Sequence, residues 1–429
     1  MNRDATKALL RRLFDAAVAA AHPSLCLKPA LPKPPEKGRI VILAAGKAAG
    51  SMAEVTEQYY YAAGLPAEKI CGVAVTRHGY GRPTRQIEMV EAGHPVPDAA
   101  GLRATERVLS LAHQANDGDL VLVLLSGGAS ANWIAPARGI SLEDKRELTR
   151  LLLASGAGIG EINTVRKHLS RIKGGRLAAC ASRAEVLTLA ISDVPGDDPS
   201  VIGSGPTVPD VSTLGNAQAI LRRRKIEPPI SIAQALLDTK NETPKPDDPV
   251  FSRSEYRIIA RPADALSAAA EAARKAGIHP IILGDQIEGE AREIARRHAQ
   301  QALQLAGKNT PSVLLSGGEL TVSLRGKGKG GPNQEYALAL AHALNGAGGI
   351  AAVAGDTDGT DGGSGKADDP AGAFVDETTL LRAKGLGLDP VRFLSDNDST
   401  SFFERLGDLL APGPTFTNVN DLRAIVVDS

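Results

Sequence analysis

The residue of this sequence best placed to act on an anion is Lys47. It lies in the segment LAAGKAAGS, residues 43–51, where an apolar run gives way to a helical one. At the end of a buried strand and the start of a helix, two effects favour the binding of a phosphate or a carboxylate. These are the positive end of the helix dipole and the free backbone N–H groups of the first helical turn. The segment is not a Walker A loop, which needs Gly at position 41 and Ser or Thr at 48, because Val41 and Ala48 stand there. We therefore expect Lys47 to bind an anion rather than to be a surface lysine.

Two Ser-Gly-Gly turns each close an apolar run, one in each half of the chain. Glycine leaves backbone N–H groups open to an anion because no Cβ stands in the way. In doubly wound sheets, ligands bind at the carboxyl ends of the strands, where these turns fall. Tight turns without a ligand are the alternative, but the repetition favours ligand contact by at least one of them. The residues concerned are Ser126, Gly127, Gly128, Ser316, Gly317 and Gly318.

A glycine-rich loop at residues 326–331, GKGKGG, matches the GxGxxG pattern of dinucleotide-binding proteins. The segment before it alternates polar and apolar residues, unlike the buried first strand of a dinucleotide-binding unit. Lys327 and Lys329 interleave with the glycines and suit an oligophosphate better than the pyrophosphate of NAD. We predict a phosphate-binding loop, and the alternatives are a nicotinamide site and a flexible hairpin with solvated lysines.

Two acidic loops, at residues 193–198 and 355–363, follow apolar runs and could hold a divalent cation. Oxygen ligands without a nearby Cys or His pair suit Mg²⁺, which bridges one or two carboxylates to substrate phosphates. Asx-turns and helix caps are the alternative use of these aspartates. The predicted metal ligands are Asp193, Asp358 and Asp361.

A basic segment, residues 162–176, has its apolar residues at helical spacing, so most of its charges are expected on a solvated face. Arg166 or Lys173 could instead turn inward and meet a carboxylate or a phosphate. His94, in the segment GHPVPD, is interpreted as a turn residue first and a catalytic candidate second.

These residues need strands and helices to bring them together. Nearly continuous runs of Val, Ile, Leu and Ala predict strands of parallel sheets that are buried on both faces. Periodic segments between them predict helices at 102–115, 142–154, 262–276 and 288–306, so the predicted class is α/β. The predicted strands are 39–46, 69–76, 119–128, 185–192, 279–285, 312–318, 349–356 and 422–428.

The length of 429 residues suits two α/β domains. The segment 242–255, rich in proline and charge, predicts a linker between domains 1–241 and 256–429, and the last strand could pack back on the first domain. The 49 basic and 49 acidic residues cancel, so a small molecule is a better partner than nucleic acid or a membrane. Three scattered cysteines, and an amphipathic N-terminal helix in place of a signal peptide, predict a cytoplasmic protein.

The sequence resembles the class II glycerate 2-kinases, a family often labelled hydroxypyruvate reductase, whose C-terminal region is called the MOFRL domain. The resemblance implies a larger Rossmann-like N-terminal domain, a smaller α/β C-terminal domain of MOFRL type, and an active site in the cleft. It also implies phosphorylation of D-glycerate to 2-phosphoglycerate with ATP and Mg²⁺. It rests on segments found in this order along nearly the whole chain: GHPVPD, LLSGGAS, INTVRKHLSRIKGGRLA, ISDVPGDDPSVIGSGPTVPD, LSGGELTV, GKGKGGPNQEYALALA, DTDGTDGG, NDSTSFF and TNVNDL.

The resemblance matches Lys47 and Asp193 to motif residues of the family, and for a kinase we assign roles to these and other residues as follows. Lys47 would stabilise the transferring phosphoryl group, and Asp193 would orient or deprotonate the C2 hydroxyl. The turn at 126–128 and Arg166 would hold the glycerate carboxylate. The implied nucleotide-binding residues are Ser316, Gly317, Gly318, Arg325, Lys327, Gly328, Lys329, Asn333 and Glu335.

The sequence departs from the family pattern at two positions. Pro332 stands where the family motif GGRNQE has arginine, so the role of that arginine could fall to Arg325, Lys327 or Lys329. Phe416 stands where glycine is usual. The alternative function is an NAD(P)H-dependent hydroxypyruvate reductase, and the oligomeric state, a homodimer included, is left open.

Overall fold

The computed structural model describes residues 2–308, 310–363 and 365–428. The chain forms two compact units. The N-terminal unit consists of Leu27–Ile259, and the C-terminal unit joins Met1–Cys26 to Ala260–Ser429.

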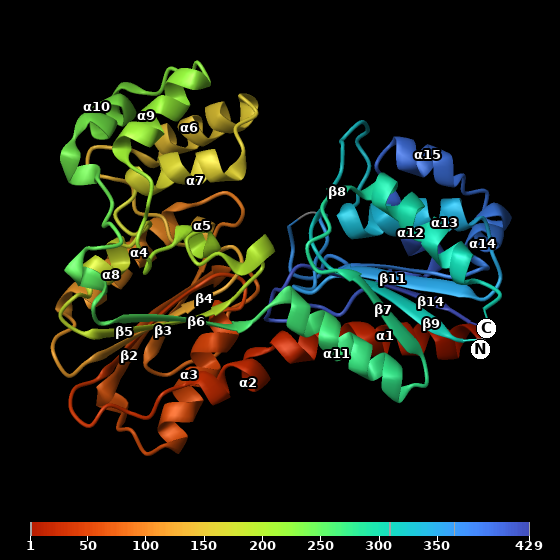
Figure 1. Cartoon of the computed structure of the whole chain (residues 1–429), viewed down its shortest axis with the longest axis horizontal. Coiled ribbons are helices and arrows are strands. Elements are labelled where there is room, and N and C mark those ends of the chain that lie inside the picture. Colours follow the sequence, from red (N-terminus) through yellow and green to blue (C-terminus); the bar gives the residue numbers. More distant parts are fainter. Residues whose placement is uncertain (1, 309, 364, 429) are drawn as a thin grey trace. The chain divides into compact units, whose positions relative to one another are not determined.

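The N-terminal unit is built on a six-stranded sheet with the order β3-β2-β1-β4-β5-β6 (Figure 1). The pairings from β3 to β5 are parallel. In this doubly wound order the direction of the crossovers reverses between β1 and β4. The prediction of a Rossmann-like N-terminal domain is therefore confirmed. The strands are β1 (Ile40–Ala45), β2 (Ile70–Arg77), β3 (Ile87–Ala92), β4 (Leu120–Leu125), β5 (Glu185–Ile191) and β6 (Ser254–Ala260).

Helices cover both faces of this sheet, with α3 on one face and α4 and α8 on the other (Figure 1). All residues of β1 and β4 are buried, as expected for strands covered on both sides. The helices beside the sheet are α3 (Ala49–Ala62), α4 (Ala99–Gln114), α5 (Ala129–Asn132) and α8 (Arg176–Cys180).

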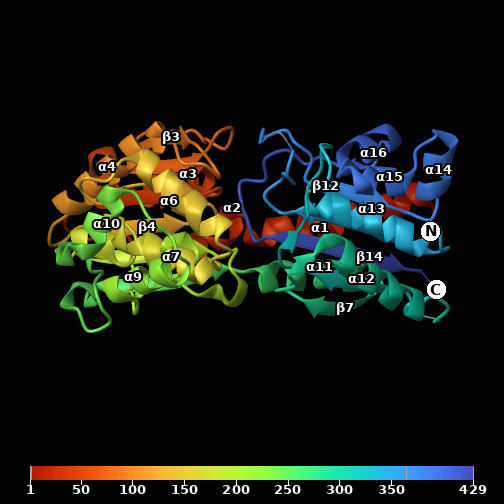
Figure 2. The same cartoon turned by 90° about the horizontal axis from the view of Figure 1, so that it is seen from above.

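Four further helices of the N-terminal unit form a separate group around a small apolar core of their own, in which Leu152, Val165 and Ile232 are buried (Figures 1 and 2). Their apolar residues meet one another rather than the sheet. The four helices are α6 (Leu142–Ala154), α7 (Ile159–His168), α9 (Leu214–Arg223) and α10 (Ile230–Leu237).

The C-terminal unit contains a six-stranded sheet with the order β13-β12-β11-β14-β9-β7. Only β7 and β9 pair in parallel, and the four other pairings are antiparallel. The prediction of parallel sheets is wrong for this unit, because a continuous apolar run reports burial on both faces and not strand direction. A short parallel pair, β8 and β10, lies apart from this sheet. The strands are β7 (His279–Gly284), β8 (Gly289–Glu290), β9 (Ser312–Ser316), β10 (Leu320–Thr321), β11 (Ile350–Asp356), β12 (Gly372–Val375), β13 (Leu409–Leu410) and β14 (Asp421–Val427).

Helices also cover both faces of this second sheet. Figure 1 shows α1 and α11 on one face and α12 and α13 on the other, and α12 and α13 lie side by side. In the described part of the chain, no helix combines the length and apolar character needed to cross a membrane. The helices are α1 (Arg3–Ala21), α2 (Pro23–Cys26), α11 (Pro262–Lys275), α12 (Ala291–Leu305), α13 (Pro332–Leu344), α14 (Thr379–Gly385), α15 (Pro390–Ser395) and α16 (Ser399–Leu406).

The limits of the two units differ from the predicted domains 1–241 and 256–429. Helix α1 is amphipathic as expected, but it packs on α11 in the C-terminal unit. Arg3 pairs there with Asp376 and Asp408 at 2.8 and 2.7 Å. Strand β6 extends the N-terminal unit beyond the predicted linker 242–255, and β14 lies inside the C-terminal sheet instead of packing back on the first domain. The spacing of apolar residues identifies α1 as an amphipathic helix. It does not reveal that α1 packs on α11, which lies more than 200 residues further along the chain.

Candidate active site

The carboxyl ends of β1 and β4 lie side by side at the point where the strand order reverses, and the two strands pair in register up to their last residues. The backbone N–H of Lys47 donates to the carbonyl oxygen of Gly127 at 2.8 Å. The backbone N–H of Ala48 donates to Ser126 Oγ at 2.9 Å. These bonds hold the Lys47 turn against the first Ser-Gly-Gly turn, at the place where doubly wound sheets bind ligands.

Gly128 brings two side chains close to the backbone of this turn. Its φ of +84° is a conformation that glycine adopts without strain. A Cβ at position 128 would lie 2.9 Å from Cδ2 and Nε2 of His94 and 3.5 Å from Cγ of Lys47. His94, which the sequence indicated as a turn residue first, therefore lies beside Lys47 in this site.

Asp193 stands two residues beyond β5, the neighbour of β4. The in-register pairing of β4 with β5 places it beyond the sheet edge, near the level of the first Ser-Gly-Gly turn. β1 and β5 are separated by two strand spacings of about 4.8 Å each. Lys47 and Asp193, both half-buried, can therefore act on one small substrate.

Arg166 lies on α7, and its Nε is buried without a hydrogen-bond partner. Burial lowers the pKa of its guanidinium. Arg166 also lies close enough to Lys145 and Lys173 to lower the pKa of each lysine, in addition to the larger effect of burial. The sequence pattern indicated Arg166 and Lys173 as inward-facing candidates but gave no sign of Lys145, which belongs to the separate helix α6.

The second Ser-Gly-Gly turn surrounds a cation of the same chain. Arg423, on β14, is 1% exposed and donates to Ser316 Oγ at 3.2 Å and to the carbonyl oxygens of Gly317 and Gly318. It also pairs with Asp421 at 2.9 Å. These oxygens are therefore engaged inside the unit, and the N–H of Gly317 donates to the carbonyl oxygen of Gly284 at 2.8 Å. Both observations favour a scaffold role for the turn, and its contact with a nucleotide stays a prediction.

The predicted phosphate loop is held by the segment 396–398. Each backbone N–H from Arg325 to Lys329 donates to an oxygen of that segment, at 2.7 to 3.1 Å. No buried strand leads into the loop, since β10 ends at Thr321. The amides are therefore engaged with protein oxygens, whereas the side chains of Arg325, Lys327 and Lys329 are exposed.

Asn333 and Glu335 lie in the first turn of α13 and are 1% exposed. Glu335 pairs with Arg292 at 2.6 Å. Asn333 Nδ2 donates to Asp361 and Asp421, at 3.3 and 2.7 Å. Both side chains therefore have partners inside the unit, although Asn333 Oδ1 is buried without one, and their direct contact with a nucleotide stays a prediction.

The backbone at the two departures from the family pattern accommodates Pro332 but not Phe416. Pro332 occupies the start of α13, where the missing backbone N–H has no partner within the helix in any case. Phe416 has a φ of +57°, in the left-handed region that a glycine adopts more easily.

Asp361 and Asp358 are used as backbone acceptors. Asp361 Oδ1 accepts from the N–H of Asn333 at 3.0 Å, and Oδ2 accepts from the N–H of Gln334 at 2.9 Å. Burial raises the pKa of Asp361 to about 7, although these donors act in the opposite direction. Asp358 Oδ1 accepts from the N–H of Thr360 at 2.7 Å. Over residues 2–308, 310–363 and 365–428, no group of three or more His, Cys, Asp or Glu could hold a metal ion, so these bonds favour a structural role.

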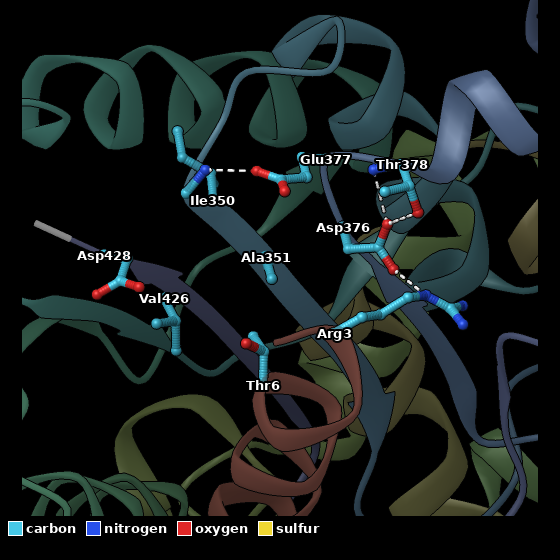
Figure 3. A pocket seen from close by; sticks show the side chains of 10 residues that line it. Arg3, Thr6, Ile350, Ala351, Asp376, Glu377, Thr378, Val426 and Asp428 are labelled. Carbon is cyan, nitrogen blue, oxygen red and sulfur yellow. Dashed lines mark hydrogen bonds and ion pairs between the residues drawn. The ribbon is translucent and has the colours of Figure 1, made fainter. Parts of the chain in front are cut away.

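A pocket of about 200 Å³ opens in the C-terminal unit at the start of β11 (Figure 3). Arg3 reaches across it to Asp376, and Glu377 accepts from the N–H of Gly349 at 2.7 Å. None of its lining residues was predicted as a site residue, and the loop that carries Asp358 follows the opposite end of β11. The pocket is therefore distinct from the candidate site in the N-terminal unit.

Comparison with known proteins identifies relatives over the whole chain. Residues 9–237 match the family described as a domain of unknown function (DUF4147), and residues 312–421 match the MOFRL family. A protein of Agrobacterium vitis named "Putative hydroxypyruvate reductase" is 48% identical, covering 99% of this chain and 95% of that protein. The D-glycerate 2-kinase of Thermotoga maritima is 41% identical, covering 98% of each chain.

The structural comparison agrees with the sequence comparison. The crystal structure of the glycerate kinase of Thermotoga maritima superposes with a TM-score of 0.87 at 40% identity. The match covers 99% of this chain and 100% of that one. The similarity therefore extends over both units.

Proposed function

Because the chain belongs to the class II glycerate kinase family, with a DUF4147 region followed by a MOFRL region, we propose that it is a glycerate 2-kinase. It transfers a phosphoryl group from ATP to the C2 hydroxyl of D-glycerate. The observation that carries the proposal is the place of Lys47, a cation at the switch point of a doubly wound sheet. Phosphoryl transfer depends mostly on positioning and charge neutralisation, which such a lysine supplies.

In the proposed reaction, different residues of the N-terminal unit bind the substrate, stabilise the phosphoryl group and accept the proton. Lys47 stabilises the charge on the transferring phosphoryl group. The turn at 126–128 and Arg166 hold the glycerate carboxylate, and Asp193 orients the C2 hydroxyl and accepts its proton. Two hydrogen bonds tie the Lys47 turn to the Ser-Gly-Gly turn, so the substrate and the phosphoryl group are positioned by one rigid backbone unit.

Asp193 is the predicted metal ligand that fits Mg²⁺ best. Its half-buried carboxylate stands two residues beyond β5, in the same unit as Lys47, whereas Asp358 and Asp361 belong to the C-terminal unit. Mg²⁺ keeps several waters and needs only one or two carboxylates, so a single aspartate is compatible with it. When bound, Mg²⁺ neutralises charge on the phosphates of the nucleotide.

The nucleotide phosphates are contacted by the exposed side chains of Arg325, Lys327 and Lys329, rather than by the amides of their loop. These three cations also supply the positive charge that the family arginine would bring at position 332. The other predicted nucleotide-binding residues belong to the same unit. They are Ser316, Gly317, Gly318, Gly328, Asn333 and Glu335.

The second candidate function is an NAD(P)H-dependent hydroxypyruvate reductase, the activity named for the Agrobacterium vitis relative. The GxGxxG segment at 326–331 supports it weakly. A dinucleotide fingerprint follows a buried strand and offers free amides to the pyrophosphate. Here β10 has two residues, and the amides from Arg325 to Lys329 are engaged.

Two assays on the purified protein separate these functions. In the first, D-glycerate, ATP and Mg²⁺ are supplied, ADP is measured, and the product is identified by NMR as the 2-phosphate or the 3-phosphate. In the second, hydroxypyruvate is supplied with NADH or NADPH and the loss of absorbance is followed. Formation of 2-phosphoglycerate supports the kinase, whereas oxidation of NAD(P)H without ADP formation overturns it.

A further inference from the structure

The N-terminal unit contains three cations close together that the fold does not neutralise. Lys145, on α6, is 4% exposed, and Lys173, after α7, is 1% exposed. Arg166, on α7, has a fully enclosed Nε. Burying a charge without a counterion costs several kcal/mol, so such a cluster needs an explanation.

The contacts of these three residues are to neutral groups. Lys145 Nζ donates weakly to the carbonyl oxygen of Leu169, at 3.5 Å. Lys173 Nζ donates to the carbonyl oxygen and the hydroxyl of Ser130, at 2.8 and 2.6 Å. Arg166 Nε has no partner. Across the residues that the structure describes, no carboxylate lies near enough to favour the charged form of any of the three.

A neighbouring lysine shows that the same fold neutralises a buried charge elsewhere. Lys167 follows Arg166 on α7 and is 7% exposed, but it pairs with Asp210 at 3.4 Å. The absence of such a partner for Lys145 and Lys173 is therefore a local property and not a general feature of these helices. Unneutralised buried charge of this kind marks functional sites.

The cluster adjoins the candidate active site. Ser130 belongs to α5, which begins directly after Gly128, so Lys173 is tied to the element that follows the Ser-Gly-Gly turn. Ser130 Oγ also lies 2.9 Å from Ser204 Oγ, which donates to Asn163 Oδ1 at 3.4 Å. Lys145 and Arg166 come from α6 and α7 (Figure 1), whereas Lys173 and the two serine hydroxyl groups come from segments outside that group of helices. Cations and neutral hydrogen-bonding groups thus come together next to the element that follows the turn.

We propose that Lys145, Arg166 and Lys173 form one oxyanion pocket that receives the carboxylate of the hydroxy-acid substrate. The carboxylate supplies the counterion that the fold omits, and the pocket selects 2-hydroxy acids over neutral polyols of the same size. The proposal rests on the proposed function for the identity of the substrate, and it adds Lys145 and Lys173 as specificity-determining residues. A phosphate has the same oxyanion chemistry, and the test distinguishes the two.

The test is isothermal titration of the full chain, with a non-hydrolysable ATP analogue present, against D-glycerate, glycerol and inorganic phosphate in turn. We expect the parent protein to bind D-glycerate and not glycerol. Lys145→Met and Lys173→Met, which keep the apolar stem, should each weaken D-glycerate binding at least tenfold and leave the affinity for the nucleotide analogue within twofold. In turnover, the KM for D-glycerate should rise more than kcat falls.

Lys167→Met is the matched control, because it removes a buried lysine that has its own carboxylate. It should lower Tm and leave D-glycerate affinity within twofold, whereas Lys145→Met should leave Tm unchanged or raise it. D-glycerate affinity within twofold of the parent in both Lys145→Met and Lys173→Met overturns the proposal. So does loss of phosphate affinity alone, which would assign the pocket to a phosphate. A parent that binds D-glycerate through these lysines but forms no ADP would refute the kinase and leave the pocket standing.

Discussion

At the scale of single residues, the proposed mechanism depends on the position of the Lys47 ammonium group. Lys47 is half-buried, its backbone is fixed to Gly127, and its side chain lies beside Gly128. Such a lysine is positioned before the substrate arrives, so its charge acts on the transition state without reorganisation.

Replacement of Lys47 tests this role. Lys47→Ala should lower kcat by roughly 100-fold or more, because one preorganised electrostatic contact is lost. The Kd for ATP should change much less. Steady-state kinetics and nucleotide titration measure the two quantities, and Lys37→Ala, at an exposed lysine of the same unit, is the control. Near-normal turnover in Lys47→Ala would remove Lys47 from the mechanism.

The charge on Lys145 makes stability depend on pH. Burial, with a smaller effect of Arg166, lowers the pKa of Lys145 from 10.5 to about 7. Between these values the unfolded chain binds more protons than the folded one, so this lysine makes stability rise as pH increases from 7 to 10. The full effect is on the order of 5 kcal/mol.

Thermal unfolding of the parent and of Lys145→Met at pH values from 7 to 10 measures this contribution. The difference in Tm should favour the variant at pH 7 and shrink toward pH 10. A difference that does not change with pH would show that folding does not lower the pKa of Lys145.

At the scale of elements, one sequence motif is used in two ways. The turn at 126–128 follows a parallel strand and adjoins Lys47, whereas the turn at 316–318 surrounds the buried Arg423. The repetition in the sequence predicted two similar turns at strand ends, and both are present. The first turn lies beside Lys47 and the second beside Arg423. Both neighbours are distant in the sequence, so no local sequence pattern predicts these different environments.

Substitutions at Asp361, which contacts the start of α13, and at Asp193 test which aspartate is structural and which binds the metal. Asp361 accepts from two backbone N–H groups of α13, and an asparagine has only one oxygen to accept them. Asp361→Asn should therefore lower Tm, by loss of about 0.5–2 kcal/mol of stability. The Mg²⁺ concentration for half-maximal activity should not change. In Asp193→Asn the opposite is expected, with a higher Mg²⁺ requirement and near-normal Tm. A raised Mg²⁺ requirement in Asp361→Asn would restore that residue as a ligand.

Helix α1 is held to the C-terminal unit by its apolar face. Phe14 is fully buried, and a Cβ on Gly355 of β11 would lie 3.0 Å from its ring. Phe14→Ala should therefore cost about 3–5 kcal/mol of stability. Arg12→Ala, on the exposed face of the same helix, should change stability by no more than about 0.5 kcal/mol. Denaturant unfolding measures both, and equal effects would contradict the packing of α1.

Much of the N-terminal unit could be predicted from sequence. Its apolar runs correspond to β1, β2, β4 and β5, and the expected place of Lys47 at the end of β1 is where the structure has it. Less could be predicted for the C-terminal unit, because burial on both faces does not reveal strand direction. The part of the site that is formed by turns could be predicted from the sequence. Lys145 could not, because nothing in the sequence of its helix marks this lysine as buried.

At the scale of the whole molecule, the two units differ in how the sequence builds them. The N-terminal unit is one continuous segment, Leu27–Ile259, with apolar cores of its own. We expect residues 27–259 expressed alone to fold cooperatively, because no strand or helix of that unit is missing. Thermal unfolding and limited proteolysis check this expectation. The fragment should lack kinase activity, since the proposed nucleotide-binding cations belong to the other unit. An aggregated or protease-sensitive fragment would contradict the expectation that residues 27–259 fold on their own.

The discontinuous C-terminal unit imposes an order on synthesis. Helix α1 ends at Ala21, but α11, on which it packs, begins only at Pro262, and the central strand β14 ends at Val427. At about 5–20 residues per second, the ribosome needs roughly 10 to 50 seconds to reach α11 after it has made α1. During that interval the N-terminal unit is synthesised and can begin to fold, while the apolar side of α1 has no partner and is open to chaperones or to another nascent chain. Helix α1, which is made before the whole N-terminal unit, therefore reaches its packing partner only after that unit has been synthesised.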